Sequence, residues 1–310
     1  MSSSQTLTPR ALEILERLVA FDTTSRLSNL ALIEWVEAYL DGHGVAHRRV
    51  PNADGTKSNL IATIGPDIPG GVVLSGHTDV VPVDGQPWTS DPFQVTPRDG
   101  RLYGRGTCDM KGFLALSLAA IPDILAAQPK KPVHLAFSYD EEVGCIGAPD
   151  MIRIIASELP RPALVVVGEP TNMEAVSGHK GINTFRVTVR GHEAHSSQTQ
   201  LGASANMVAI RLMGMLCDLA EQLERDADPA SLFTPKHATL TVGQMNGGTA
   251  VNILARECVF LFDLRSPPGL DPKAVLAPFF EACAAADAAL KARFPDTGVE
   301  VVQRSHTPPL

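Results

Sequence analysis

The 310-residue sequence has few cysteines, and none of them form a closely spaced pair. There are five, an odd number, scattered along the chain: Cys108, Cys145, Cys217, Cys258 and Cys283. Without C-x-x-C spacing, neither a disulfide framework nor a structural zinc site built from thiolates is expected. The pattern instead predicts reduced thiols and a cytoplasmic protein.

Long apolar runs and basic clusters are also lacking. Charged residues or prolines interrupt every hydrophobic segment before it reaches the roughly 20 residues that a membrane-spanning helix needs. The formal net charge is −8, and Lys and Arg neither follow a helix face nor alternate with aromatic residues. Residues 1–21 open polar and then show helical spacing, unlike a signal peptide. We therefore expect no membrane and no nucleic acid as partner.

Two domains are predicted, because the chain is longer than a single hydrophobic core usually supports. Residues 58–170 alternate apolar segments with helical segments. The expected strands cover residues 59–64, 71–77, 133–139 and 163–168, and the expected helices cover residues 111–127 and 147–158. This alternation indicates an α/β layer whose sheet is mostly parallel and buried on both faces.

The pattern changes after residue 178, where residues 182–191 alternate strictly between apolar and polar side chains. A helix over 203–225, strands over 238–245 and 257–265, a helix over 271–293 and a strand over 298–303 follow. The order β-α-β-β-α-β is that of the split βαβ, or ferredoxin-like, arrangement. Residues 179–304 are therefore expected to form one compact domain.

Titratable side chains gather where the expected strands of the first domain end, at the edge where open α/β sheets bind ligands. They are His77, Asp79, Asp140, Glu141, Glu142 and Glu169, and Asp109 joins them from a glycine-rich turn. Six carboxylates and one imidazole in one crevice would be costly to bury without a cation. The set predicts a metal centre for Zn²⁺, Co²⁺ or Mn²⁺, and the number of donors indicates two ions that share a carboxylate.

Each motif alone has an ordinary structural explanation. A histidine in a strand is commonly a core residue, D-E-E is commonly a solvated turn, and G-E-P is commonly a loop. Their repetition at the same end of successive strands favours the metal centre.

The segments SGHTDVVPVDGQPWTSDPF, GRGTCDMKGF, DEEVG, GEPT and HKG resemble, in order, the signature segments of the dinuclear metal-dependent amidohydrolase and peptidase family. The resemblance implies an α/β metallohydrolase domain with an inserted ferredoxin-like α+β domain that serves as lid and dimerisation domain. We therefore expect residues 1–178 to form the catalytic metal-binding domain, residues 179–304 the lid, and residues 305–310 the start of the return to the catalytic domain.

The resemblance also assigns the site residues. It implies that His77 and Glu169 bind one metal ion, that Glu142 binds the other, and that Asp109 bridges the two. Glu141 would be the general base.

Further positions follow from the same resemblance. It implies a cis peptide between Asp109 and Met110, which is rare in proteins. Asp79 lies two residues after His77, so its carboxylate is expected to hold the imidazole in the metal-binding tautomer. The resemblance makes His195 an oxyanion donor, although a surface-loop histidine fits the sequence equally well. H-E-A-H at this point is one residue short of the H-E-x-x-H zinc motif.

Arg265 and Asn252 resemble family positions that bind the substrate carboxylate, and Lys180 is expected to contribute in a similar way. A guanidinium suits a substrate carboxylate because it can pair with both oxygens, while an ordinary strand-end salt bridge is the alternative for Arg265.

One family element has no counterpart in the sequence. The family supplies a last histidine to the second metal from a segment that follows the lid, and His306 comes too early to match it. We expect a weakened second metal site and an uncovered apolar sheet edge, in either a true short protein or a truncated one.

The tail DGQPWTSDPF and the HKG after GEPT most resemble the branch of the family that deacetylates N-acetylornithine. The expected function is metal-dependent release of acetate and ornithine in arginine biosynthesis, with a small N-acyl amino acid as ligand and a second copy of the chain as partner. A desuccinylase of succinyl-diaminopimelate, an aminoacylase and a metal-binding fragment of low activity stay open. GRGTCD lacks the last glycine of a dinucleotide-binding loop, and no G-x-S-x-G is present.

Overall fold

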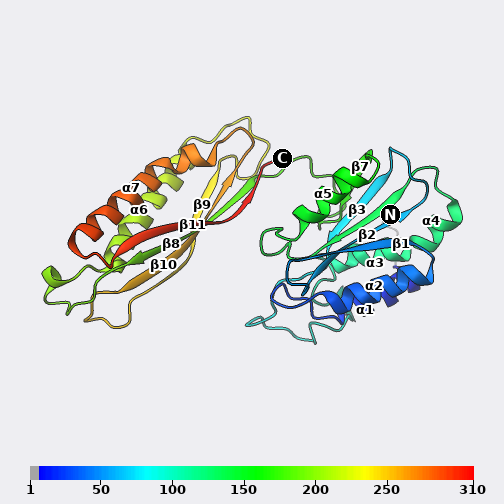
Figure 1. Ribbon diagram of the computed structural model, residues 1–310, viewed down its shortest axis with the longest axis horizontal. Helices are drawn as coiled ribbons and strands as arrows, with labels where there is room; N and C mark the ends of the chain where they lie inside the picture. The colour runs from blue at the N-terminus through cyan, green and yellow to red at the C-terminus, as the bar shows by residue number, and fades with distance from the viewer. Residues whose placement is uncertain (1–6) are drawn as a thin grey trace. The chain divides into compact units, whose positions relative to one another are not determined.

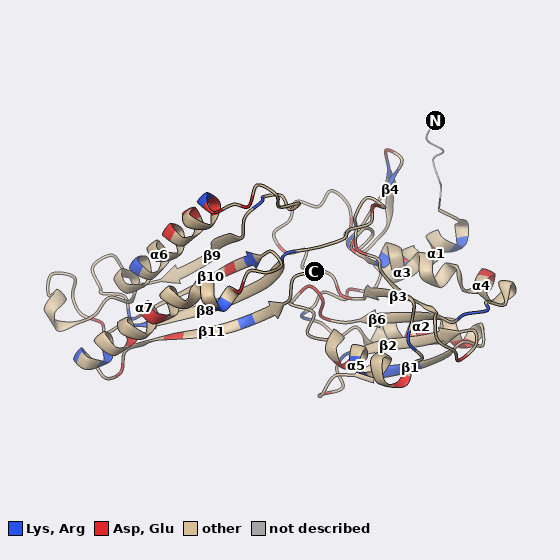
Figure 2. Cartoon of the chain, turned by 90° about the horizontal axis from the view of Figure 1, so that it is seen from above, with Lys and Arg blue, Asp and Glu red and all other residues tan. Residues whose placement is uncertain are grey.

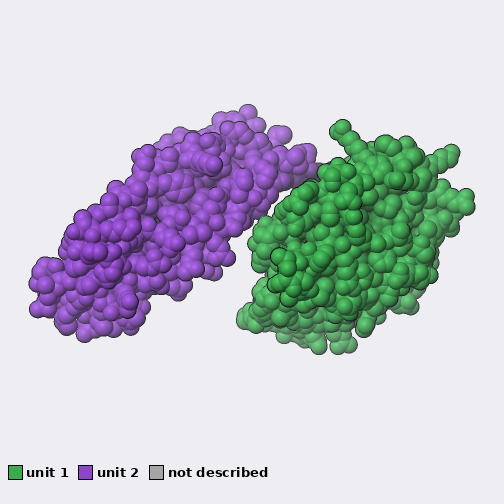
Figure 3. Space-filling model, viewed as in Figure 1, with its two compact units in different colours: residues 1–174 green, residues 175–310 purple. Residues whose placement is uncertain are grey.

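The computed structural model describes residues 7–310 and separates into two compact units, residues 1–174 and residues 175–310 (Figures 1 and 3). Lys and Arg are interspersed with Asp and Glu along both units (Figure 2). Within residues 7–310, no helix is both long enough and apolar enough to cross a membrane. All five cysteines are free thiols.

The first unit is built on a five-stranded sheet with the order β1-β2-β6-β3-β7. Its strands are β1 (Ala46–Pro51), β2 (Ser58–Ile64), β3 (Val72–His77), β6 (Val133–Ser138) and β7 (Leu164–Val167). β2 is antiparallel to both of its neighbours, and β3 is parallel to β6 and to β7. Four strands therefore run in one direction and β2 in the other, which confirms the mostly parallel α/β sheet.

Helices cover both faces of this sheet (Figure 1). They are α1 (Pro9–Val19), α2 (Leu30–Gly42), α3 (Lys111–Ala119), α4 (Ile121–Ala127) and α5 (Ala148–Glu158). Alternate residues of β2 face opposite layers: Leu60 packs in the core with α1, α2 and α3, and Ile61 packs in the core with Met151 of α5. This alternation follows from the two-residue period of a strand.

The start of α1 follows ordinary capping chemistry. Thr8 caps the helix with its side chain, which accepts a hydrogen bond from Ala11 N–H, and Pro9 occupies the first turn. The polar opening over residues 1–6 lies outside the described residues.

Three details of the first unit differ from the sequence prediction. The single helix expected over 111–127 is two helices, because Pro122 cannot donate the backbone hydrogen bond that a continuous helix requires. A short hairpin of β4 (Thr96–Arg98) and β5 (Arg101–Tyr103) was not expected. β7 was expected to be buried on both faces, but all four of its residues are exposed, with Val167 at 59%.

The second unit has a four-stranded antiparallel sheet with the order β11-β8-β10-β9. Its elements are β8 (Gly181–Arg190), the 3₁₀ turn η1 (Thr199–Leu201), α6 (Ala205–Arg225), β9 (Thr239–Gly247), β10 (Glu257–Ser266), α7 (Pro272–Arg293) and β11 (Gly298–Thr307). The two long helices share a core with the sheet, in which Phe260, Phe262 and Phe279 are buried. The first and last strands thus lie side by side, and the ferredoxin-like arrangement is confirmed.

The two ends of this unit meet. β11 continues to Thr307, and Leu310 exchanges backbone hydrogen bonds with His179, at 3.0 and 3.1 Å. His306 lies within β11, where its Nδ1 is 2.9 Å from Oδ1 of Asn183. Residues 305–310 therefore belong to the second unit, as do residues 175–178.

Candidate metal centre

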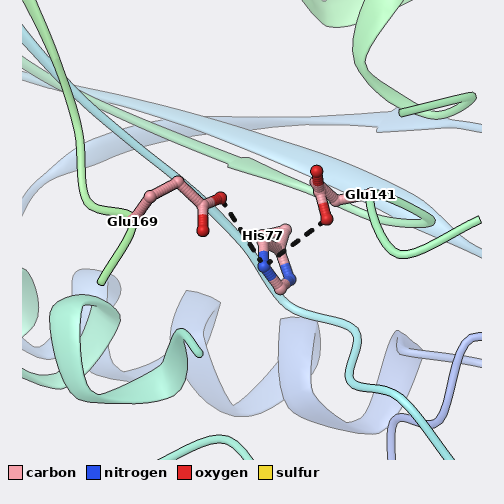
Figure 4. A group of neighbouring side chains, drawn as sticks. All are labelled: His77, Glu141 and Glu169. Carbon is pink, nitrogen blue, oxygen red and sulfur yellow. Dashed lines mark ion pairs between the residues drawn. The ribbon is translucent and has the colours of Figure 1, made fainter. Parts of the chain in front are cut away.

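The candidate site lies at one edge of the first sheet. β3 ends on His77, β6 ends at Ser138 shortly before Glu141, and β7 ends at Val167 shortly before Glu169. Since these strands are parallel, their carboxyl ends lie together, where open α/β sheets bind ligands. The side chains of His77, Glu141 and Glu169 point toward one another (Figure 4).

His77 Nε2 is the common centre of this group. It lies 3.0 Å from Oδ1 of Asp109, 3.8 Å from Oε2 of Glu141 and 3.8 Å from Oε1 of Glu169. Two sets of three side chains have ligand atoms within 4.8 Å of one another: His77 with Asp109 and Glu142, and His77 with Glu141 and Glu169. One imidazole nitrogen surrounded by carboxylate oxygens is a donor set that suits Zn²⁺, Co²⁺ or Mn²⁺.

The charges of the site also fit a cation. Burial, followed by the charge of Asp109, raises the pKa of Glu142 to about 7, and burial likewise raises the pKa of Glu169. Burial lowers the pKa of His77, but its interaction with Asp79 and the charge of Glu141 outweigh this and raise it to about 10. In the metal-free protein, bound protons therefore compensate the crowded negative charge of the site. A divalent cation would take over this task.

Asp79 contacts His77 through its backbone carbonyl as well as through its carboxylate. His77 Nδ1 is 2.8 Å from the backbone carbonyl oxygen of Asp79 and 3.6 Å from its Oδ1. The carbonyl therefore accepts the Nδ1 proton and leaves Nε2 free for a metal. β3 ends at His77, so Asp79 follows the strand directly.

The carboxylate of Asp79 also binds the segment with the paired glutamates. It accepts hydrogen bonds from the backbone N–H of Glu141 at 3.1 Å, from that of Glu142 at 3.2 Å and from the hydroxyl of Ser25 at 2.7 Å. Burial raises the pKa of Asp79, but the neighbouring His77 and the hydrogen bond from Ser25 outweigh burial, so the net shift is downward. Asp79 is thus a buried anion that holds two chain segments in place.

Asp109 approaches His77 from the turn before α3. The peptide bond between Asp109 and Met110 is cis, as the family resemblance implied. Met110 is fully buried, whereas the Asp109 side chain is 48% exposed. The bond thus joins a core side chain to one that faces the site.

In the second unit, His195 and Asn252 lie on two adjoining loops. Ser196 N–H donates to the carbonyl of Asn252 at 2.9 Å, and Leu254 N–H donates to that of Ala194 at 2.9 Å. Ser197 N–H donates to His195 Nδ1 at 3.2 Å, and the Ser197 hydroxyl lies 2.8 Å from the same nitrogen, so Ser197 occupies the Nδ1 edge of the ring. His195 and Asn252 are both exposed.

Arg265 and Lys180 already have partners within the second unit. Arg265 Nε donates to Oδ2 of Asp263 at 2.6 Å, which is the strand-end ion pair that the sequence left open. Lys180 Nζ donates to the backbone carbonyls of Pro235 at 2.7 Å and His237 at 2.6 Å. Burial lowers the pKa of Lys180. The ammonium is therefore engaged mainly by the chain itself.

Sequence reasoning missed three residues that contact the site segment: Ser25, Lys57 and Asn59. Lys57 directly precedes β2 and Asn59 is its second residue, yet the sequence pattern gave neither of them a role. The signal that could have revealed them is the position of polar side chains at the start of a strand that is buried over almost its whole length.

Residues 73–309 match the model of peptidase family M20/M25/M40. The chain is 36% identical to an acetylornithine deacetylase of Photorhabdus laumondii over 271 residues, which cover 84% of this chain and 69% of that protein. It is 39% identical to the acetylornithine deacetylase of Myxococcus xanthus over 267 residues, which cover 84% of this chain and 68% of that protein.

Solved structures agree on the fold. An M20 family metallo-carboxypeptidase from Sulfolobus solfataricus superposes with a TM-score of 0.73 at 18% identity, covering 98% of this chain and 79% of that chain. A dinuclear metal-binding peptidase of the M20 family from Bacillus subtilis superposes with a TM-score of 0.58 at 14% identity, covering 97% of this chain and 74% of that chain.

The fold and the sequence matches together place the protein among the metal-dependent hydrolases that act on amide bonds. Within that class, the chain belongs to peptidase family M20/M25/M40.

Proposed function

We propose that the protein hydrolyses the amide bond of N-acetylornithine, releasing acetate and ornithine in arginine biosynthesis. The observation that carries this proposal is His77 Nε2 surrounded by Asp109, Glu141 and Glu169 at the carboxyl ends of parallel strands. N-acetylornithine is proposed as the substrate because four acetylornithine deacetylases are 33% to 39% identical to the chain.

Two divalent metal ions are the proposed cofactor, with zinc as the first choice and cobalt or manganese as alternatives. His77, Asp109 and Glu169 would hold one ion, and Asp109 and Glu142 would hold the other. When bound, such ions lower the pKa of a water molecule and polarise an amide carbonyl. In support of these ligands, donor atoms of His77, Asp109 and Glu142 lie within 4.8 Å of one another, and so do those of His77, Glu169 and Glu141.

Glu141 is the proposed general base. Its side chain is 36% exposed, and Oε2 faces His77 at 3.8 Å, so a water molecule beside the cluster is within its reach. Glu141 would take the proton of that water and deliver it to the departing amine. Glu142 is proposed as a ligand of the second metal ion instead, because its carboxylate groups with His77 and Asp109.

Residues of the second unit would bind the substrate. Nε2 of His195 is free to donate a hydrogen bond to an oxyanion, since Ser197 occupies Nδ1. Asn252 and Arg265 would bind the substrate carboxylate; the bond from Arg265 to Asp263 uses Nε and leaves the terminal Nη groups for such pairing. Lys180 would contribute the least, because two backbone carbonyls already accept its protons.

We also propose that the protein forms a homodimer through the second unit. Met207, Ile210, Gly214 and Cys217 make an exposed apolar stripe along α6, at helical spacing. The stripe borders the edge strand β9, and the two line a groove of about 450 Å³. We call this surface the α6–β9 face.

A second copy suits the α6–β9 face because the helix is self-complementary. Arg211 lies three residues before Gly214, and Asp218 lies three residues after Met215, so the two are symmetric about that point of the helix. If two such helices pack antiparallel about a twofold axis, each arginine meets the aspartate of the other copy. The unpaired edge of β9 would be covered at the same time.

The protein is placed in the cytoplasm by this proposal, where its five free thiols stay reduced. The substrate is tested by comparing kcat/KM for N-acetylornithine, N-succinyl-diaminopimelate and a set of N-acetyl amino acids, with bound zinc measured on the same samples. We expect N-acetylornithine to be the best substrate. A preference for the succinyl compound or for other acyl amino acids would replace the proposed activity by that of a related deacylase. Bound metal without hydrolysis would instead indicate a metal-binding protein of low activity.

A further inference from the structure

The loop over residues 139–147 carries both Glu141 and Glu142, yet it lies between β6 and α5 without regular structure. Asp140 and Cys145 have positive φ angles of 55° and 58°, a region that side chains other than glycine seldom adopt. Such a backbone persists only where surrounding contacts determine it. The contacts that hold this loop are therefore part of how the site is built.

Asn59 binds the two ends of the loop with a single side chain. Its Oδ1 accepts from Tyr139 N–H at 3.2 Å, and its Nδ2 donates to the carbonyl of Gly147 at 2.9 Å. Asn59 is 1% exposed, so both bonds are shielded from water. The loop is closed at its base by these two bonds.

Lys57 binds the loop one residue before Glu141. Its Nζ lies 2.5 Å from Oδ1 of Asp140, and the two side chains are only 14% and 10% exposed. The same Nζ donates to the backbone carbonyl of Ser25. The ion pair is therefore well shielded and is tied to a second segment of the chain, unlike a typical surface salt bridge.

Both sets of restraints meet at Ser25. Its carbonyl binds Lys57, while its hydroxyl donates to the Asp79 carboxylate that holds the N–H groups of Glu141 and Glu142. The backbone of the two glutamates is thus fixed from the preceding residue by Lys57 and from their own amides by Asp79. Their carboxylates reach His77 only if this backbone stays where it is.

We propose that Lys57 and Asn59 are positioning residues, which hold the loop over residues 139–147 so that Glu141 and Glu142 face His77. Neither residue touches the carboxylates themselves. The kinetic part of this inference rests on the hydrolase function proposed above, while the structural part does not. Because a displacement of about 1 Å at a catalytic group can cost roughly 100-fold in rate, loss of either residue should act on turnover.

The test compares Lys57→Met with Lys57→Arg and with the control Arg49→Met. The control removes another ion pair in the same unit, which joins Arg49 on β1 to Glu37 on α2. Hydrogen exchange of a peptide that covers residues 139–147 is measured by mass spectrometry, with residues 133–138 as the internal reference. Bound zinc, kcat and KM for N-acetylornithine are measured on the same samples.

We expect Lys57→Met to speed exchange in residues 139–147 and leave residues 133–138 unchanged. It should lower kcat about 10- to 100-fold with KM changed less than about threefold, and Lys57→Arg should restore most of the rate. Arg49→Met should change neither the exchange nor kcat. Asn59→Asp, which keeps Oδ1 but loses the amide donor, should give a similar pattern.

Exchange in residues 139–147 that stays at the wild-type rate in Lys57→Met overturns the inference, whether or not the protein hydrolyses anything. Faster exchange with an unchanged kcat in an active enzyme also overturns it. If the wild type hydrolyses no acyl amino acid while the loop exchanges faster in Lys57→Met, the proposed function fails and the structural part of the inference stands. Should Lys57→Met not fold, Asp140→Asn removes the same ion pair and gives the same readouts.

Discussion

Asp79 holds His77 with its backbone carbonyl oxygen, at 2.8 Å, and its carboxylate binds the neighbouring segment. One residue therefore sets both the tautomer of the imidazole and the place of the two glutamates. This arrangement separates two effects that a substitution can test, because exchange of the side chain leaves the carbonyl in place.

Asp79→Asn is expected to lower kcat at least about tenfold. An asparagine offers one acceptor oxygen, and its amide group would face a backbone N–H of Glu141 or Glu142 with no bond to make. His77 keeps its carbonyl partner, so part of the bound zinc should remain. The measurement is kcat together with zinc content.

Ser25→Ala serves as the matched control, since it removes only the hydroxyl that donates to the same carboxylate. Losing one hydrogen bond to a charged group should lower the free energy of unfolding by about 1.5–3 kcal/mol. We expect Ser25→Ala to lower kcat less than Asp79→Asn does. Equal rates for Asp79→Asn and the wild type would contradict the role of the carboxylate.

Glu141→Gln is expected to abolish most turnover while zinc content persists. A glutamine keeps the shape of the side chain but cannot accept a proton, and a general base contributes about 10²- to 10⁴-fold to a rate. Zinc per subunit and kcat are measured together. Glu158→Gln, which removes an exposed ion pair with Arg48 in the same unit, is the control. Retained activity in Glu141→Gln would rule out Glu141 as the base.

Glu142→Gln is expected to stabilise the metal-free protein at pH 8. Burial and Asp109 raise the pKa of Glu142 from 4.5 to about 7, so the folded state holds this proton more tightly than the unfolded state does. The free energy of unfolding therefore falls as the pH rises from 4.5 to 7, and the penalty is complete above pH 7. Allowing for solvent screening, we expect a gain of roughly 1–2 kcal/mol.

Urea unfolding with a chelator present, between pH 5 and pH 8, measures this gain. It should shrink toward pH 5, where Glu142 is largely protonated in the folded wild type. With saturating zinc the order should reverse, because the wild type binds the metal more tightly and gains more stability from it. Glu13→Gln on α1, at an exposed position, is the control. A gain independent of pH would contradict this account.

Much of the candidate metal centre could be predicted from the sequence, because its residues follow strands that are easy to recognise. Apolar runs indicate buried parallel strands, and parallel strands bring their carboxyl ends to one edge, so His77, Glu141 and Glu169 were expected to meet. Asp109 was assigned through the family resemblance, since a glycine-rich turn does not by itself reveal where it leads.

The rest depends on contacts between distant segments. Lys57 meets Asp140 across 83 positions in the sequence, and Asp79 meets Ser25 across 54. Polar residues before a strand favour a turn, and nothing local reveals that their side chains bind another loop. The same limit applies to β7, where the apolar run predicts a strand but does not tell what covers it.

Ile210→Asp is expected to convert a dimer into a monomer. Ile210 is 53% exposed in the middle of the apolar stripe of α6, and Met245 of β9, at 60%, lines the same groove. In a twofold interface each change is introduced twice, so two carboxylates would be buried within it. Light scattering coupled to gel filtration, at several protein concentrations, gives the mass of the particle.

Leu232→Asp is the control, because Leu232 is 97% exposed outside the α6–β9 face and its change should leave the mass unaltered. If Ile210→Asp and the wild type have the same mass at every concentration, the α6–β9 face is not the interface.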